Sequence, residues 1–258
     1  MDFILSNSKL RAWEDLCPIE FKALYIDKIV PRVETWDQAW GNYFETLCIG
    51  GGINGAFSFE KSQHGEKMLK SVYLDRVKAQ AKEFEKFKDI VCGKVLSRQE
   101  YIRTVVLSAS GQRIPIEGTL DAKWELKNGK RAVIDLKLTG DTENDFGEFQ
   151  WGNPDKKDMS QIVHYGLLDS IMHKVDYPLT KYWVFDKGTE MKKKLINVTP
   201  SQFAINDHIE RCAKAYNEIE MAITMNDWQP KNTYENCKNC RAKCKFERVM
   251  PEEYEVIL

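Results

Sequence analysis

Residues 112–139 predict a β-hairpin with a buried second strand, and this stretch constrains the fold more than any other. Residues 112–126 are rich in β-forming side chains and alternate in polarity, and residues 127–130 (Lys-Asn-Gly-Lys) carry an Asn-Gly turn signal. The run that follows, residues 132–134 (Ala-Val-Ile), is continuously apolar, as in a strand covered on both faces. We therefore expect an α/β fold with this hairpin inside the central sheet.

Three charged residues interrupt this otherwise apolar pair of strands. Asp121 lies in the first strand, and Asp135 and Lys137 lie two apart in the second, so the latter two share one face. A carboxylate buried without a partner is strongly destabilising, so these side chains need compensation. A divalent cation held by Asp121 and Asp135 supplies it, and hard oxygen ligands with open positions for water suit Mg²⁺ or Mn²⁺.

The order of these residues resembles a known family. Gly118-x-x-Asp121, then Asp135-x-Lys137, then Gln161-x-x-x-Tyr165 are similar to the ordered motifs of the PD-(D/E)XK nuclease superfamily, in its RecB-like branch. That branch includes exonucleases associated with CRISPR adaptation and the nuclease domains of helicase–nuclease complexes. The resemblance covers roughly residues 1 to 250. It implies a restriction-endonuclease-like core, with a mixed sheet of about five strands flanked by helices, and a metal-dependent DNA exonuclease.

The resemblance also implies roles for individual residues. Asp121, Asp135 and the backbone carbonyl of Leu136 are expected to hold one or two Mg²⁺ or Mn²⁺ ions, with His64 as a further ligand. Lys137 is expected to orient the attacking water or to stabilise charge on the phosphate during hydrolysis.

Two of these assignments compete with simpler interpretations. His64 is equally well explained as a surface histidine near a helix start, in which case Glu60 and Glu66 are the fallback ligands. Gln161 and Tyr165 are neighbours on one helix face. Taken alone they suggest a solvated residue and a core aromatic, whereas in the resembling family they face the active site and help to position DNA.

Hydrophobic periodicity predicts the remaining elements. In the last helix we expect Phe203, Ile205, Ile209, Cys212, Tyr216 and Ile219 on one buried side. The predicted helices cover about residues 6–48, 60–88, 157–175 and 201–227, and the predicted strands cover about residues 101–109, 112–126, 131–139, 180–187 and 192–198. This order indicates a mixed α/β core.

The cysteines predict a cluster that joins the two ends of the chain. Cys237-x-x-Cys240-x-x-x-Cys244 has close spacing typical of metal or cluster ligation, and Cys17 is the candidate fourth ligand. In the resembling iron–sulfur nucleases, one amino-terminal and three carboxy-terminal cysteines hold a 4Fe-4S cluster. The second gap is shorter here than is usual in that family, so zinc and free thiols remain as alternatives. The other cysteines, Cys48, Cys92 and Cys212, are interpreted as small buried hydrophobes.

These features divide the chain into three parts. Residues 1–50 form a helical N-terminal part with one cluster cysteine, residues 51–200 form the nuclease core, and residues 201–258 contain a helix and the cysteine tail. The cluster is expected to join the N- and C-terminal helical parts over the core.

Charge and hydropathy limit which partners and which cellular compartment are expected. The net charge of −1 excludes a global attraction to nucleic acid, so any DNA-binding surface is local. Residues 192–194 (three lysines) are interpreted as solvated charge, whereas Lys238, Arg241, Lys243, Lys245 and Arg248 surround the cysteines and are candidates for phosphate contacts. No apolar run approaches the ~20 residues of a membrane span. We expect a cytoplasmic protein of a bacterial, archaeal or phage-infected cell.

The expected partners are DNA, as single strands or duplex ends, together with further copies of the chain or recombination or CRISPR proteins. A hypothesis from another class is a DNA-binding or adaptor subunit with a vestigial nuclease site and a structural metal cluster. A plain zinc-ribbon interaction protein is a third. The presence of all five motif residues, Asp121, Asp135, Lys137, Gln161 and Tyr165, favours the nuclease.

Overall fold

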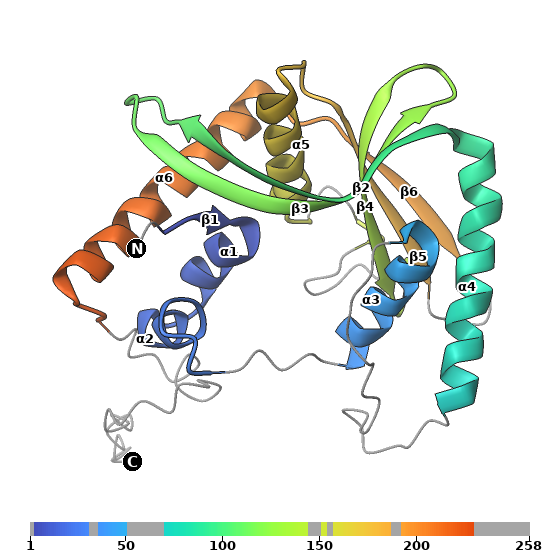
Figure 1. Cartoon of the computed structure of the whole chain (residues 1–258), viewed down its shortest axis with the longest axis horizontal. Helices are drawn as coiled ribbons and strands as arrows, with labels where there is room; N and C mark the ends of the chain where they lie inside the picture. Colours follow the sequence, from blue (N-terminus) through green and yellow to red (C-terminus); the bar gives the residue numbers. More distant parts are fainter. Residues whose placement is uncertain are drawn as a thin grey trace, which may run out of the picture.

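The protein has three layers, with one mixed sheet between two groups of helices (Figure 1). The computed structural model describes residues 3–30, 36–50, 70–143, 151–153, 157–186 and 192–229. In chain order, the elements are β1 (Leu5–Ser6), α1 (Asn7–Asp15), α2 (Pro18–Phe21), the π-helix η1 (Lys22–Ile26), α3 (Trp36–Ile49), α4 (Lys70–Val91), β2 (Cys92–Leu107), β3 (Arg113–Leu126), β4 (Arg131–Thr139), α5 (Ser160–His173), β5 (Leu179–Asp186), β6 (Lys193–Val198) and α6 (Gln202–Met225).

The sheet has the strand order β1-β3-β4-β5-β6, and β2 also pairs with β3. The β2–β3, β3–β4 and β5–β6 pairs are antiparallel, and the β4–β5 and β1–β3 pairs are parallel. The predicted mixed α/β core is confirmed. The predicted count of about five strands misses the two-residue β1, which has no periodicity for a sequence pattern to detect.

The two faces of β4 are buried against different helices, as its continuous apolar run requires. Val133 packs into the core formed with α1, α5 and α6. Ala132, Ile134 and Leu136 pack into the second core, which contains Trp40, Phe44 and Phe84 of α3 and α4. Because successive residues of a strand face opposite sides, Asp135 and Lys137 share the face of Val133, on the side of α5.

Two predictions on the elements need correction. The strand predicted from about residue 101 begins at Cys92, directly after α4, and pairs with β3 over most of its length. Residues 92–100 carry few apolar side chains because one side of this ribbon is exposed, so they lack the signal of a buried strand. Phe203 is 80% exposed, so it does not belong to the buried stripe of α6, which starts at Ile205.

A network of charged side chains around the buried Asp169 joins α5 to the strands beneath it. The Asp169 carboxylate of α5 is fully buried and lies 2.5 Å from Nη2 of Arg131 and 3.2 Å from Nζ of Lys123. Lys123, which is also buried, lies 2.5 Å from a carboxylate oxygen of Glu100. His173 approaches Glu100 to 2.9 Å. These ion pairs join α5 to β2, β3 and β4 at the end of the helix remote from Gln161.

None of the helices that the structure describes is long and apolar enough to cross a membrane.

Candidate functional site

The candidate site lies where β3 and β4 separate. Their antiparallel ladder pairs Glu125 with Arg131 and ends with Ala122 opposite Ile134. One step further, Asp121 and Asp135 stand at the opening. The N–H of Leu136 donates to Oδ2 of Asp121 at 2.9 Å, in place of a backbone acceptor on β3. The carboxylate of Asp121 thus completes the end of the ladder and is held in position by it.

Asp135 is fully buried and forms an ion pair with Lys137. Oδ2 of Asp135 lies 2.6 Å from Nζ of Lys137. Burial raises the pKa of Asp135 above its usual range, although the Lys137 ammonium acts in the opposite direction. Burial by itself lowers the pKa of Lys137, but the charges of Asp135 and Asp121 outweigh that effect and raise it. Lys137 therefore stays charged at neutral pH.

The carboxyl groups of Asp121 and Asp135 are close enough to influence each other's protonation. Burial, followed by the charge of Asp135, raises the pKa of Asp121 well above its usual range. Oδ1 of Asp135 has no donor among the side chains and backbone groups that the structure describes. Two carboxyls so close either share a proton or bind a cation between them. The donor set, with oxygens only and one of them unpartnered, fits Mg²⁺ or Mn²⁺.

A third carboxylate, Glu45 of α3, belongs to the same electrostatic group. Burial, followed by the charge of Asp135, raises the pKa of Glu45 to about 6, and Glu45 in turn raises that of Asp121. The side chain of Gln99 donates a hydrogen bond to Glu45. Gln99 has a left-handed backbone (φ 47°) and lies between the paired residues Arg98 and Glu100 of β2, opposite Asp121. The backbone of β2 is therefore locally distorted where the Gln99 side chain reaches Glu45.

Glu45 was missed by the sequence analysis, which assigned this role to His64 or to Glu60 and Glu66. The only feature of the sequence that could have pointed to Glu45 is its position directly after Phe44, which packs in the core. An acid at the margin of an apolar helix stripe is common, so that signal does not single it out. His64, Glu60 and Glu66 lie outside the described residues, and their assignment stays a prediction.

Helix α5 presents Gln161 and Tyr165 toward the same opening. Nε2 of Gln161 donates to the hydroxyl of Tyr165 at 3.1 Å. Burial and the charges of Asp121 and Asp135 raise the pKa of Tyr165, so its hydroxyl stays protonated. Gly118 of β3 allows α5 to approach: a Cβ at this position would lie 2.7 Å from Cδ1 of Leu168 and 3.4 Å from the Tyr165 ring. The predicted motif glycine therefore has a steric role in placing α5.

A groove of about 370 Å³ extends from these two side chains toward the start of α1. Its polar lining combines hydroxyl, amide and guanidinium donors with one carboxylate. The lining includes Ser6, Asn7, Ser8, Arg11, Tyr101, Glu117, Gln161 and Tyr165. The groove therefore carries polar side chains along its lining and shares Gln161 and Tyr165 with the carboxylate site.

Cys17 is the only predicted cluster ligand among the described residues. It is buried at the start of α2, where Pro18 takes the first helical position. The described chain beyond α6 returns to this corner, because the Trp228 ring lies 6.4 Å from that of Trp13 and 5.9 Å from Nζ of Lys22. Cys237, Cys240 and Cys244 lie outside the described residues, as do the basic residues around them.

Two of the three lysines of residues 192–194 take part in ion pairs with surface acids. Nζ of Lys193 lies 3.6 Å from Glu83, and Nζ of Lys194 lies 3.7 Å from Glu143. These contacts agree with the interpretation of this run as ordinary surface charge.

Fold and topology together define an α/β protein whose central mixed sheet is flanked by helices. The crystal structure of a "putative exonuclease" from Eubacterium rectale has the same fold: the TM-score is 0.65 at 13% sequence identity, over 96% of this chain and 90% of that one. At this identity the likeness establishes the fold alone. The crystal structure of SSO0001 aligns over 93% of this chain and 84% of that one, at 13% identity and a TM-score of 0.35, which carries no argument. No protein-family model matches the sequence, and no curated protein matches it either.

Proposed function

We propose that the protein is a divalent-metal-dependent DNA nuclease of the PD-(D/E)XK type. The observation that carries the proposal is the convergence of Asp121 and Asp135 with Lys137 at the opening between β3 and β4. The similarity of fold to the Eubacterium rectale protein supports it.

Each residue has a distinct task in phosphodiester hydrolysis. Asp121 and Asp135 would hold Mg²⁺ or Mn²⁺, with Glu45 as a third acid and the carbonyl of Leu136 as a further oxygen. The cation supplies positive charge for the phosphate and lowers the pKa of the attacking water. Lys137, kept protonated by its neighbours, stabilises charge on the phosphate and orients the water. Gln161 and Tyr165 donate hydrogen bonds at the mouth of the groove.

We propose that the groove holds part of one nucleic-acid strand. Arg11 and the hydroxyls of Ser6 and Ser8 are suited to phosphate oxygens, and Tyr101, which is 59% exposed, offers a ring for base stacking. A channel of this kind, leading to a site between strands, favours a single strand or an unpaired duplex end. We therefore propose exonuclease activity on DNA, with weak non-specific affinity that falls with salt.

A cleavage assay on end-labelled DNA tests the function. Single-stranded and blunt duplex substrates are incubated with the full chain in Mg²⁺, in Mn²⁺ and in chelator. We expect release of short products from the ends in either metal and none in chelator. Cleavage in chelator, or the absence of cleavage in both metals, contradicts the proposal. DNA binding without cleavage in any metal instead supports the adaptor hypothesis.

The cysteine cluster is a second proposal about cofactors. Near the end of the described chain, Trp228 lies against Trp13 and Lys22, which precede and follow Cys17 in the sequence. We propose that Cys17, Cys237, Cys240 and Cys244 bind a 4Fe-4S cluster, with zinc as the alternative. Absorbance near 400 nm together with iron content separates the two on one preparation.

Asp121→Asn is expected to raise the stability of the metal-free protein. Its raised pKa means that the folded state favours the protonated carboxyl, so stability is lost as the pH rises through the folded pKa. Asparagine removes the repulsion from Asp135 and keeps an acceptor for the Leu136 N–H. At pH 7.5 in chelator we expect a Tm a few degrees above wild type, because 1 kcal/mol shifts Tm by about 2–4 °C in domains of this size.

The response to metal tests whether the higher stability of Asp121→Asn comes from the loss of carboxylate repulsion at the metal site. Mn²⁺ should raise the Tm of the wild type and leave that of Asp121→Asn almost unchanged, as differential scanning fluorimetry would detect. Lowering the pH from 8 to 6 in chelator should reduce the difference in Tm between Asp121→Asn and the wild type. A variant that is less stable than wild type in chelator, yet gains equally from Mn²⁺, would show that Asp121 does not bind the cation.

Glu45→Gln is expected to weaken metal binding without unfolding the chain. Glutamine keeps the shape and a hydrogen-bonding partner for Gln99, but removes a charge that acts on Asp121 and Asp135. We expect the Mn²⁺ concentration for half-maximal cleavage to rise by about 10-fold or more, as for other losses around a metal centre. Glu143→Gln, at an acid that is 63% exposed, is the matched control and should not change it.

A further inference from the structure

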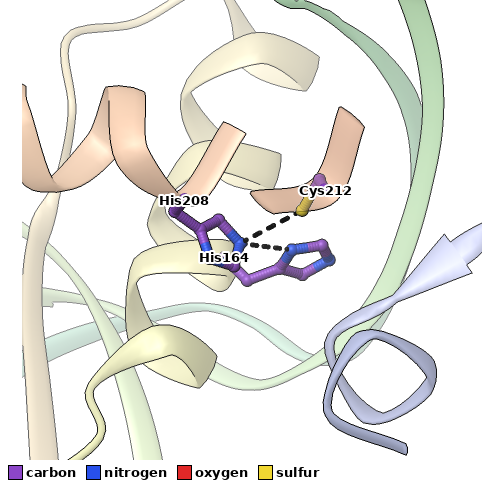
Figure 2. Close-up of side chains that lie close together, drawn as sticks. All are labelled: His164, His208 and Cys212. Atoms are coloured by element: carbon purple, nitrogen blue, oxygen red, sulfur yellow. Dashed lines mark hydrogen bonds between the residues drawn. The ribbon is translucent and has the colours of Figure 1, made fainter. Parts of the chain in front are cut away.

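A second group of metal-binding side chains lies between α5 and α6, separate from the carboxylates. His164 comes from α5, and His208 and Cys212, one turn apart, come from α6 (Figure 2). All three are at most 2% exposed. Their ligand atoms lie within 4.8 Å of one another. We propose that these three residues form a zinc site that fastens α6 to α5.

The backbone determines which nitrogen of His164 is available. Nε2 of His164 lies 3.1 Å from the carbonyl oxygen of Glu117, and a carbonyl oxygen only accepts hydrogen bonds. Nε2 therefore carries the proton, and Nδ1 presents a lone pair toward His208. A histidine that donates one ring N–H to a carbonyl and offers the other nitrogen has the arrangement found in protein metal ligands.

The three groups do not satisfy one another without a cation. Nδ1 of His164 lies 3.0 Å from Nε2 of His208, and Sγ of Cys212 lies 3.7 Å from the same nitrogen. If Nε2 of His208 carries a proton, it donates a hydrogen bond to Nδ1 of His164, and the Cys212 thiol then has no acceptor at this nitrogen. If Nε2 of His208 carries a lone pair, it accepts a hydrogen bond from the thiol, but it then faces the lone pair on Nδ1 of His164. Moreover, Nδ1 of His208 is buried with no hydrogen bond from the described residues.

The spacing fits a tetrahedral zinc ion. With Zn–N bonds of about 2.0–2.1 Å and Zn–S bonds of about 2.3 Å, two nitrogen ligands stand about 3.3 Å apart, and nitrogen and sulfur about 3.6 Å apart. The distances here are 3.0 Å and 3.7 Å. Small movements of two side chains therefore admit the ion. Two imidazoles and a thiolate are ligands that zinc prefers, and they leave a fourth position for water.

The two histidines are already neutral at neutral pH, as metal ligands must be, whereas the thiol has to lose its proton when the metal binds. Burial lowers the pKa of His164 to about 4 and that of His208 to about 3, so both rings are neutral. Burial raises the pKa of the Cys212 thiol to about 12, so the thiol is protonated without a metal. Binding of Zn²⁺ therefore releases one proton from Cys212 and places the thiolate next to the ion.

The site would brace the helix that carries the DNA-facing residues. His164 directly precedes Tyr165, and its Nε2 holds the carbonyl of Glu117, next to Gly118. Zinc would tie these elements to α6 at one point in the core. The ion has a structural role in this position, since none of its ligands lines the groove.

Metal analysis of purified full-length variants tests the site. Cys212→Ala removes the thiolate, and His164→Gln removes the ligand nitrogen while its amide still donates to Glu117. Cys48→Ala is the matched control, because Cys48 is a buried cysteine on α3 outside the cluster. We expect each test variant to hold one zinc equivalent less than wild type, and Cys48→Ala to equal it. Added Zn²⁺ should raise the Tm of wild type and of Cys48→Ala by more than that of either test variant.

Equal zinc content and an equal Tm response in all four proteins would overturn the proposal and leave a hydrogen-bonded cluster. If both test variants fail to fold, X-ray absorption spectroscopy at the zinc edge of the wild-type protein tests the site instead. Zinc coordinated by both nitrogen and sulfur atoms supports the site. Zinc coordinated by sulfur atoms alone assigns all the zinc to the cysteine tail and overturns the proposal.

Discussion

Asp135→Asn is expected to reduce DNA cleavage by about 10³-fold or more. The variant keeps the shape of the side chain and removes a negative charge from a fully buried position beside Asp121 and Lys137. Loss of a metal ligand removes several kcal/mol of transition-state stabilisation, and about 4 kcal/mol corresponds to a factor of about 10³ in rate. Initial rates on end-labelled DNA in saturating Mn²⁺ measure it.

Two controls separate chemistry from folding. Asp207→Asn, at an exposed acid on α6, should cleave DNA at the wild-type rate. The Tm of Asp135→Asn should be close to that of wild type in chelator, because the variant relieves the repulsion from Asp121 while losing the pair with Lys137. A folded Asp135→Asn protein that cleaves within 10-fold of wild type would refute the assignment of the site.

Lys137→Met gives a complementary result within the same experiment. Methionine retains the apolar stem but removes the ammonium that pairs with the carboxylate of Asp135. We expect both slower cleavage and a lower Tm in chelator, with part of the Tm recovered by Mn²⁺. Recovery follows because a bound cation replaces the lost positive charge next to Asp135.

Asp169→Ala is expected to produce the largest loss of stability. Asp169 is fully buried and forms ion pairs with Arg131 at 2.5 Å and with Lys123 at 3.2 Å. Removal of one partner from a buried ion network costs about 3–5 kcal/mol. In this network the buried Lys123 ammonium stays desolvated and keeps only Glu100 as a carboxylate partner among the residues that the structure describes. A cost of this size is a large fraction of the 5–15 kcal/mol typical of folded domains. Urea unfolding at pH 7, followed by circular dichroism, measures the change.

Two comparisons test the electrostatic origin of this loss. Asp169→Asn keeps hydrogen-bonding oxygen and nitrogen atoms at the position, so it should cost less than the alanine variant. Glu85→Ala breaks an exposed pair with Lys88 on α4 and should change stability by less than about 1 kcal/mol. If Asp169→Ala costs no more than Glu85→Ala, the buried network contributes little to the fold.

Local patterns in the chain were sufficient to predict the centre of the fold. The Asn-Gly turn and the apolar run before Asp135 predicted β3 and β4 to within one residue. Helical periodicity placed α5 and α6 within a few residues of their observed ends. These features depend on residues close together in the chain, so turn chemistry and side-chain period determine them.

Longer-range features escaped the sequence for physical reasons. The first half of β2 is polar and partly exposed, so its strand character comes from pairing with β3 and not from its own composition. Glu45 reaches Asp121 only because α3 packs across the sheet, 76 positions earlier in the chain. Cys212 looked like a small core residue, and its neighbours His164 and His208 become visible only when α5 and α6 are packed together.

The sequence by itself determined that two acids and an amine interrupt a buried hairpin, since alternation along a strand dictates which side chains share a face. It also determined the order of helices and strands around that hairpin. Only the tertiary structure decided which further groups surround the acids, where the polar groove runs and which histidines meet a cysteine. Such contacts join segments that are distant in the chain, and their formation depends on how whole elements pack, which no local pattern of residues encodes.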